Sequence, residues 1–254
     1  MSEFVDALVA RVLQLEINLL ACRERMAAGT DAEGLHDLRI AIRKLRSLLR
    51  PFRQLVEHDP LVSAAAELGR ISSAVRDSEV LLAELHRHDG FASVIARRQR
   101  VLPVHYQALI ASPEALRLQR ALDLWPGFFR QCLHEVAPDH LKTYVRKKLA
   151  KESQRLAVAL ADPGHDRHRL RLLIKRVRYC ADTYPDLVEV TPEQIKALKG
   201  GQNALGAWHD RLQWLARAEH ERELAPLVGQ WQQELVEAEK RSDKALEKLA
   251  PFFS

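Results

Sequence analysis

The sequence HDLRIAIRKLR at residues 36–46 returns as HRLRLLIKRVR at residues 168–178, and the two stretches align without a gap. His, Leu, Arg and Ile coincide in both copies, and every other basic position of the first copy stays basic in the second. At nearly the same offset, VRD at residues 75–77 matches WHD at residues 208–210. An internal repeat of this length predicts that the chain consists of two related halves.

Apolar residues recur at three- and four-residue steps along nearly the whole chain, and no segment alternates as a strand does. We expect a first helix that ends near residue 29. Further helices are expected over about 32–50, 61–87, 91–110, 114–133, 139–161, 166–183, 192–218 and 222–249. Pro51 should kink or end the second of these helices. The sequence therefore predicts an all-α, bundle-like protein, a single domain whose halves are residues 1–135 and 136–254.

The composition is that of a globular chain large enough to bury a core, with 254 residues, 47% hydrophobic and 29% charged. Lys and Arg number 39 against 34 Asp and Glu, so the formal net charge is only +5. There is no apolar run long enough for a transmembrane helix, and we expect no signal peptide and no membrane partner. Cys22, Cys132 and Cys180 are widely spaced, which favours core positions in a reducing cytoplasm over disulfides or a zinc site.

Each repeated stretch, drawn as a helix, carries a stripe of cations beside an apolar stripe. The first cationic stripe holds His36, Arg39, Arg43, Arg46 and Arg50, and the second holds His168, Arg171, Lys175 and Arg178. Like charges three or four residues apart repel by a few tenths of a kcal/mol, so a solvated face normally mixes signs. The same unfavourable pattern occurs twice, which indicates a polyanion as the ligand. The first stripe spans about 21 Å along the helix axis, a length that suits a string of phosphates.

The motif H-x-L-R-x-x-x-R-[KR]-x-R and its second copy, which Tyr179 closes, resemble the signature of the CHAD family, the conserved histidine α-helical domain. Arg76-Asp77 and LGAWHD at residues 205–210 also match the family's pattern, and the resemblance covers almost the whole chain. It implies two four-helix bundles related by a pseudo-twofold axis, with the basic helices lining a central positive cavity. It also implies binding of inorganic polyphosphate without catalysis, cofactor or metal. Asp182 stands where the second motif often has Glu.

The resemblance assigns the ligand to the repeated basic helices. Its polyphosphate-binding residues are His36, Arg39, Arg43, Lys44 and Arg46 with His168, Arg171, Lys175, Arg176 and Arg178. A second set either walls the same site or forms a solvated face, and consists of Arg23, Arg50, Lys147, Lys148, Lys151 and Arg155. If His36 and His168 gain charge on a bound anion, affinity should rise as pH falls. We predict no catalytic residue and no metal ligand.

Three other functions compete with polyphosphate binding. Nonspecific binding of RNA or DNA is the main alternative, although only Tyr179 could stack on a base beside the stripes. A metal phosphohydrolase is suggested by His-Asp dyads such as His36-Asp37, but the surrounding arginines repel a metal ion. A histidine phosphotransfer module would use His36 and Arg39, and it leaves the long cation row and its second copy unexplained. We expect a cytoplasmic protein that meets polyphosphate in solution or on granules, with other polyanions as further ligands.

Overall fold

The computed structural model describes residues 3–164 and 166–253, and of residue 138 it describes the backbone alone. Throughout these residues the regular structure is helical, which confirms the predicted all-α class. The chain divides into two compact units, Met1–Tyr144 and Val145–Ser254. The division lies inside α6 (Pro138–Leu160), whereas the sequence places it just before that helix. None of the described helices is long and apolar enough to cross a membrane.

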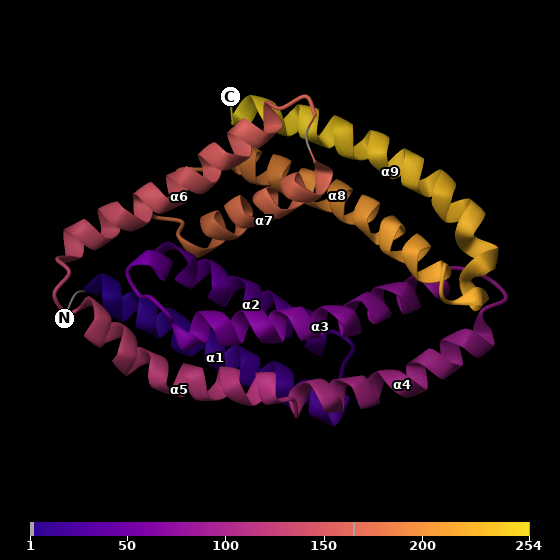
Figure 1. Cartoon of the computed structure of the whole chain (residues 1–254), viewed down its shortest axis with the longest axis horizontal. Helices are drawn as coiled ribbons and strands as arrows, with labels where there is room; N and C mark the ends of the chain where they lie inside the picture. Colours follow the sequence, from indigo (N-terminus) through magenta and orange to yellow (C-terminus); the bar gives the residue numbers. More distant parts are fainter. Residues whose placement is uncertain (1–2, 165, 254) are drawn as a thin grey trace. The chain divides into compact units, whose positions relative to one another are not determined.

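The first unit contains α1 (Glu3–Ala28), α2 (Gly34–Leu49), α3 (Pro60–Leu85), α4 (Ala92–Ile110), α5 (Pro113–Leu133) and the start of α6. α2 packs against α1 and α3, and α5 packs against α3 and α1 (Figure 1). As predicted, α2 ends before Pro51, where the chain continues as a short 3-10 helix, Arg50–Gln54. Because proline has no N–H to donate, the α-helical hydrogen bonds cannot continue through it.

The core of the first unit is built around aromatic side chains from α5. Trp125 stacks on Phe129 with ring centroids 4.2 Å apart, and Phe129 meets Phe52 edge-on at 5.2 Å. Trp125 donates its Nε1–H to Asp59 Oδ2 at 3.0 Å, while Asp59 Oδ1 accepts the N–H of Leu61 at 2.8 Å and so caps α3. One buried carboxylate therefore satisfies both a helix end and the indole.

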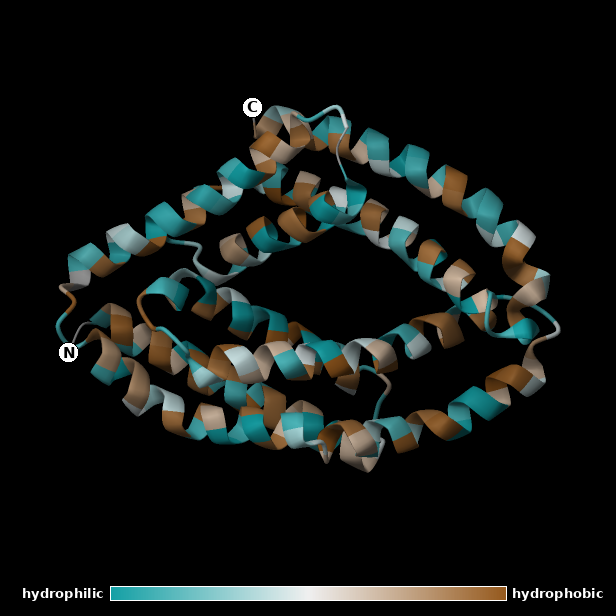
Figure 2. Cartoon of the chain, in the orientation of Figure 1, coloured by the Kyte–Doolittle hydropathy of each residue, from teal (hydrophilic) through white to brown (hydrophobic). Residues whose placement is uncertain are grey.

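The second unit contains the rest of α6 with α7 (Arg167–Thr183), α8 (Pro192–Ala218) and α9 (Val228–Leu249). α8 packs along α9 and α7, and its start is fixed by a capping box in which Thr191 and Gln194 exchange hydrogen bonds. Leu156, Ile174, Leu205 and Leu249 belong to one buried cluster that all four helices share. Figure 2 shows the hydrophobic residues recurring at intervals along each helix, as the sequence periodicity predicts.

Each basic helix approaches the following helix through a glycine. A β-carbon on Gly69 of α3 would lie 3.4 Å from Ile42 Cγ2, and one on Gly201 of α8 would lie 3.3 Å from Ile174 Cδ1. Ile42 and Ile174 occupy the same position of the sequence repeat. The pairs α2–α3 and α7–α8 thus share one close packing contact, which leaves little room for a side chain larger than a methyl group.

Two details differ from the sequence expectations. Cys22 and Cys180 are buried as expected, but Cys132 is exposed on the outer side of α5. The helix expected over 222–249 begins as a 3-10 helix, Arg222–Leu227, and becomes α9 only at Val228. Pro226 explains the difference, because it removes one backbone donor from the first turns.

The glycine contact gives a matched pair of substitutions in α8. Gly201→Leu should lower the free energy of unfolding by about 1–3 kcal/mol, because the added side chain overpacks against Ile174. Its neighbour Gly200 is exposed, and a β-carbon there meets nothing within 4 Å. Gly200→Leu should raise the free energy of unfolding by up to about 1 kcal/mol through helix propensity. Urea denaturation measures both, and equal stabilisation by the two substitutions would contradict the close approach.

Candidate anion-binding site

The predicted apolar stripe of α2 packs as expected, since Leu38, Ile42, Leu45 and Leu49 are all at most 5% exposed. The cations beside that stripe are only partly covered: His36, Arg39, Arg43, Arg46 and Arg50 are half-buried, and Lys44 is exposed. Long basic side chains can cover apolar surface with their stems while their charged ends reach solvent. The packing of α2 thus fixes a row of cations at the edge of the core of the first unit.

Arg39 is held by neutral oxygen atoms of α3. Its Nη1 donates to the carbonyl of Gly69 at 3.2 Å and to the hydroxyls of Ser72 and Ser73 at 2.7 and 3.2 Å. Burial, and then the neighbouring Arg43, lower the pKa of Arg39. These hydrogen bonds orient the guanidinium without cancelling its charge, so the charge is available to attract an anion.

His36 faces a second, fixed cation. Burial lowers the pKa of His36, and the positive charges of Arg76 and Arg43 lower it further. Arg76 of α3 donates to Glu79 Oε2 at 2.7 Å, and the hydroxyl of Tyr106 in α4 donates to Glu79 Oε1. Glu79 is only 9% exposed, so this relay from α4 holds the side chain of Arg76 in place near His36.

The corresponding part of the second unit holds a pair of histidines. Asp166 caps α7 by accepting the N–H of His168 at 2.9 Å. The exposed ring of His168 lies 5.6 Å from the ring of His209 in α8. Burial, followed by the charges of Arg171, His168 and Lys175, lowers the pKa of His209 from 6.5 to about 4. His209 is therefore neutral at neutral pH within a group of cations.

Arg178 is tied to the protein more firmly than the other cations of α7. Its Nε donates to Gln202 at 2.7 Å, its Nη1 donates to Asp182 at 2.8 Å, and its guanidinium lies 4.3 Å from the ring of Tyr179. Asp182 therefore balances part of the charge of Arg178. Arg176 is half-buried on the same helix.

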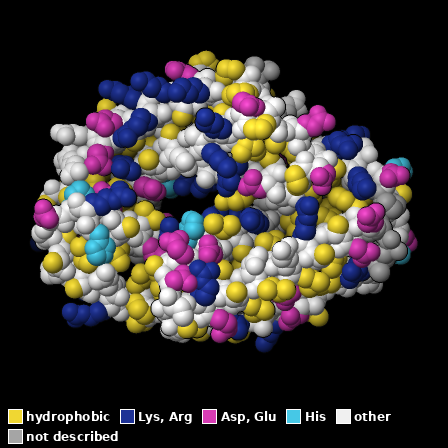
Figure 3. Space-filling model, turned by 180° about the vertical axis from the view of Figure 1, so that it is seen from behind, with side chains coloured by type: hydrophobic (Ala, Val, Ile, Leu, Met, Phe, Trp, Pro, Cys, Tyr) yellow, Lys and Arg dark blue, Asp and Glu magenta, His cyan; other side chains and the backbone are white. Residues whose placement is uncertain are grey.

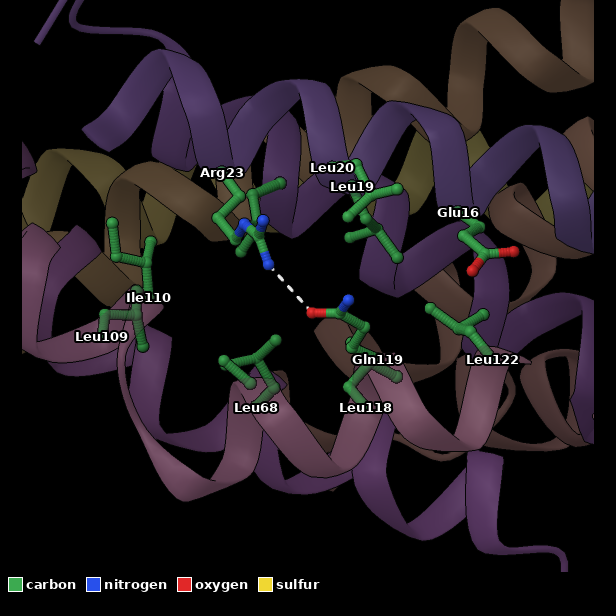
Figure 4. A pocket seen from close by; sticks show the side chains of 12 residues that line it. Glu16, Leu19, Leu20, Arg23, Leu68, Leu109, Ile110, Leu118, Gln119 and Leu122 are labelled. Atoms are coloured by element: carbon green, nitrogen blue, oxygen red, sulfur yellow. Dashed lines mark hydrogen bonds between the residues drawn. The ribbon is translucent and has the colours of Figure 1, made fainter. Parts of the chain in front are cut away.

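The second set of predicted residues is scattered. Arg23 donates to Gln119 of α5 at 2.8 Å and pairs with Glu24, and it lines a cavity of about 50 Å³ within the first unit (Figure 4). That cavity is lined mostly by leucines, which come from α1, α2, α3, α4 and α5. Lys147 and Lys151 are exposed on α6, Lys148 is half-buried, and Arg155 pairs with Glu152 at 2.6 Å. In the first unit, the structure thus places Arg23 beside α5 and Arg50 directly after α2.

Several arginines elsewhere on the described parts of the protein are paired with acids. On the face drawn in Figure 3, acidic side chains lie among the basic ones over much of the surface. Several arginines outside the repeated helices have carboxylate partners, as in Arg25–Asp31, Arg117–Glu67, Arg130–Asp6 and Arg211–Glu234. The neutral partners of Arg39 and the histidine pair of α7 and α8 stand out against this background.

Arg76 and His209 lie beside the predicted histidines His36 and His168, although the sequence assigned them no role. The alignment of residues 75–77 with 208–210 was the available signal, because it places these two residues at the same repeat position. Within the described ranges, no three His, Cys, Asp or Glu side chains are arranged to hold a metal ion.

A family model of the CHAD domain matches residues 12–219. The chain belongs to the CHAD domain family. The match includes all of α2 and α7 with their predicted cations, and the Arg76 and His209 positions. It confirms the resemblance seen in the repeated motif.

Solved structures agree with this assignment. The crystal structure of the CHAD domain from the plant Ricinus communis has a TM-score of 0.73 at 21% identity, over 99% of this chain and 92% of that one. PptA from Streptomyces chartreusis has a TM-score of 0.63 at 16% identity, over 96% and 99%. At these identities the similarity concerns the fold alone. No curated protein matches the chain. The pseudo-twofold axis and central cavity concern the arrangement of the two units and stay predictions.

The lowered pKa of His209 predicts how the stability of this CHAD domain depends on pH. The unfolded chain protonates this residue near 6.5 and the folded chain near 4, so the unfolded state binds more protons between these values. Without an anion, stability should fall as pH decreases from 6.5 towards 4. His209→Gln should show a smaller fall, because glutamine does not titrate. Denaturation midpoints across this range test the difference, with exposed His220→Gln as the control; identical profiles for all three proteins would contradict it.

Proposed function

We propose that this CHAD domain binds inorganic polyphosphate, without cleaving it, through the cations of α2 and α7. The observation that carries the proposal is Arg39, whose charge is oriented by neutral acceptors within a repeated row of cations. Arginine offers a planar fork to phosphate oxygens and lysine a compact charge, and both are present in each row. Membership of the family supports the same ligand.

A phosphate polymer explains both rows better than a small anion does. Each row extends over several helical turns, and a polymer presents a charge on every unit along its length. Both rows belong to one polypeptide, so a long chain that engages one row is present at high effective concentration for the other. Long polyphosphate should therefore bind more tightly than tripolyphosphate.

The electrostatics around the histidines favour binding over metal-dependent cleavage. His36 lies near two arginines, Arg76 and Arg43, and two acids, Glu33 and Asp37. His209 lies near Arg171 and Lys175. A divalent cation would be repelled from either group unless carboxylates outnumbered the cations. We propose that polyphosphate leaves the protein intact, and incubation with Mn²⁺ or Mg²⁺ followed by a phosphate-release assay tests this directly.

Binding of RNA or DNA is less well supported. Tyr179 is the one aromatic residue that the sequence places at a cationic stripe, and it is only 7% exposed and covered by Arg178. Base stacking, which gives single-stranded nucleic acids much of their affinity for proteins, has no platform there. We propose polyphosphate as the cytoplasmic partner, in solution or on granules, and treat RNA as a competitor in the test.

Reversing two charges in the first row should abolish tight binding. Arg43→Glu with Arg46→Glu should weaken the affinity for long polyphosphate by about a hundredfold or more, because two charge-assisted contacts are replaced by repulsion. Arg97→Glu with Arg100→Glu is the matched control, since this exposed pair has the same spacing on α4 and makes the same charge change. Circular dichroism should show unchanged helicity in both variants. Equal loss of affinity in the two variants would mean that only net charge matters.

Salt and competitors separate a specific site from a generic cationic surface. The logarithm of affinity should fall linearly with the logarithm of salt concentration, because bound counterions are released from the polyanion. Replacing one contacting cation such as Arg171 by Gln should reduce that slope by about one. At near-physiological salt, single-stranded RNA should not displace long polyphosphate; equal competition would favour the nucleic-acid function.

A further inference from the structure

The two units place different residues at the same repeat position. In the first unit the position is Arg76, a permanent cation that Glu79 and Tyr106 hold near His36. In the second unit it is His209, whose ring lies 5.6 Å from that of His168. Both residues lie on the helix that follows the basic helix, beside the histidine that opens the repeated motif. The units therefore differ in whether the partner of that histidine carries a fixed or a titratable charge.

The groups around His209 that the structure describes come from α7 and α8. From α7 it faces His168, Arg171 and Lys175, and within α8 its ring lies 6.4 Å from that of Trp208. Two acids of α9 are paired with other residues: Asp243 accepts from Arg167 at 2.8 Å and Glu234 accepts from Arg211 at 3.2 Å. Asp166 accepts the backbone N–H of His168. The groups that act on the imidazole of His209 are thus cations on α7.

This arrangement opposes a positive charge on His209 only while no anion is present. The positive groups and partial burial keep the imidazole neutral, with a pKa of about 4. Phosphate oxygens between α7 and α8 would bring negative charge to the same place and would offer acceptors for imidazole N–H groups. A protonated imidazole donates through both ring nitrogens, whereas a neutral one donates through one. Anion binding and proton uptake should then reinforce each other.

We propose that His209 and His168 form a proton-linked phosphate subsite in the second unit, which takes up a proton from solvent when a phosphate chain binds. In the first unit the equivalent residue is Arg76, which is already charged and takes up no proton when a phosphate chain binds. This inference rests on the proposed function, because it concerns the same ligand. The proposal implies that a decrease in pH raises the affinity of the second unit for polyphosphate more than that of the first unit.

Calorimetric titration with long polyphosphate tests the proposal, performed at one pH in two buffers that differ in ionisation enthalpy. The difference in observed heat gives the number of protons taken up on binding. Wild-type protein near pH 6 should take up about one proton more than His209→Arg, because the arginine is already charged. His209→Arg should still bind, since it copies Arg76, and His209→Gln should bind more weakly. The exposed His220→Gln should match the wild type.

The same variants give a second measurement from pH dependence. As pH decreases, the dissociation constant of the wild type should fall more steeply than that of His209→Arg. The difference should be up to about tenfold per pH unit, between the pKa of His209 in the bound protein and its pKa in the free protein. Equal proton uptake by wild type and His209→Arg would overturn the subsite. Should both substitutions disturb the fold, nuclear magnetic resonance of the wild-type imidazole decides: a pKa of His209 that polyphosphate leaves unchanged also overturns it. Absence of binding by the wild type at every pH is a different result, which overturns the proposed function itself.

Discussion

Neighbouring cations on α2 and α7 repel one another, and the packing of these helices must offset this repulsion for the fold to be stable. Each like-charged pair opposes helix formation by a few tenths of a kcal/mol. Burial of one leucine or isoleucine contributes about 1.5–3 kcal/mol, and Ile42, Leu45, Ile174 and Val177 are each at most 1% exposed. Packing therefore outweighs the repulsion several times over. Because the apolar side of each helix is buried, the orientation of the helix is fixed, and its cations are held together in a row.

The side chains that hold these cations differ in kind, and the difference determines how much charge an approaching anion encounters. Serine hydroxyls and a backbone carbonyl hold Arg39, so no hydrogen-bonded carboxylate neutralises it, although Asp77 and Glu79 lie close enough to offset part of its charge. A buried glutamate holds Arg76, and Asp182 holds Arg178, so these two guanidinium groups are well positioned but partly neutralised. The positive potential is strongest where neutral groups do the positioning. Because the cations are positioned before any ligand arrives, binding requires little ordering of side chains.

Most of the fold was predictable because it depends on local pattern. The periodicity of apolar residues predicted the described α-helices to within a few residues, apart from the start of α9, and Pro51 predicted the end of α2. The site was only partly predictable. The cationic rows follow from spacing within one helix, but the approach of Arg76 to His36 joins residues forty positions apart and depends on the packing of α2 on α3. The contact of Arg23 with Gln119 depends in the same way on the packing of α1 against α5, and no local pattern reveals it.

One helix belongs to both compact units. The first turns of α6 lie in the first unit, where Lys142 is 5.9 Å from the ring of Phe4, and Leu156 and Ala159 belong to the core of the second. Backbone hydrogen bonds within an α-helix run from each N–H to the carbonyl four residues earlier, so they bridge the division at residues 144 and 145. If either unit unfolds, its end of α6 loses its apolar partners. The loss of helical structure can then extend along α6 into the part that belongs to the other unit. We therefore expect the shared helix to couple the unfolding of the two units, although each has its own core.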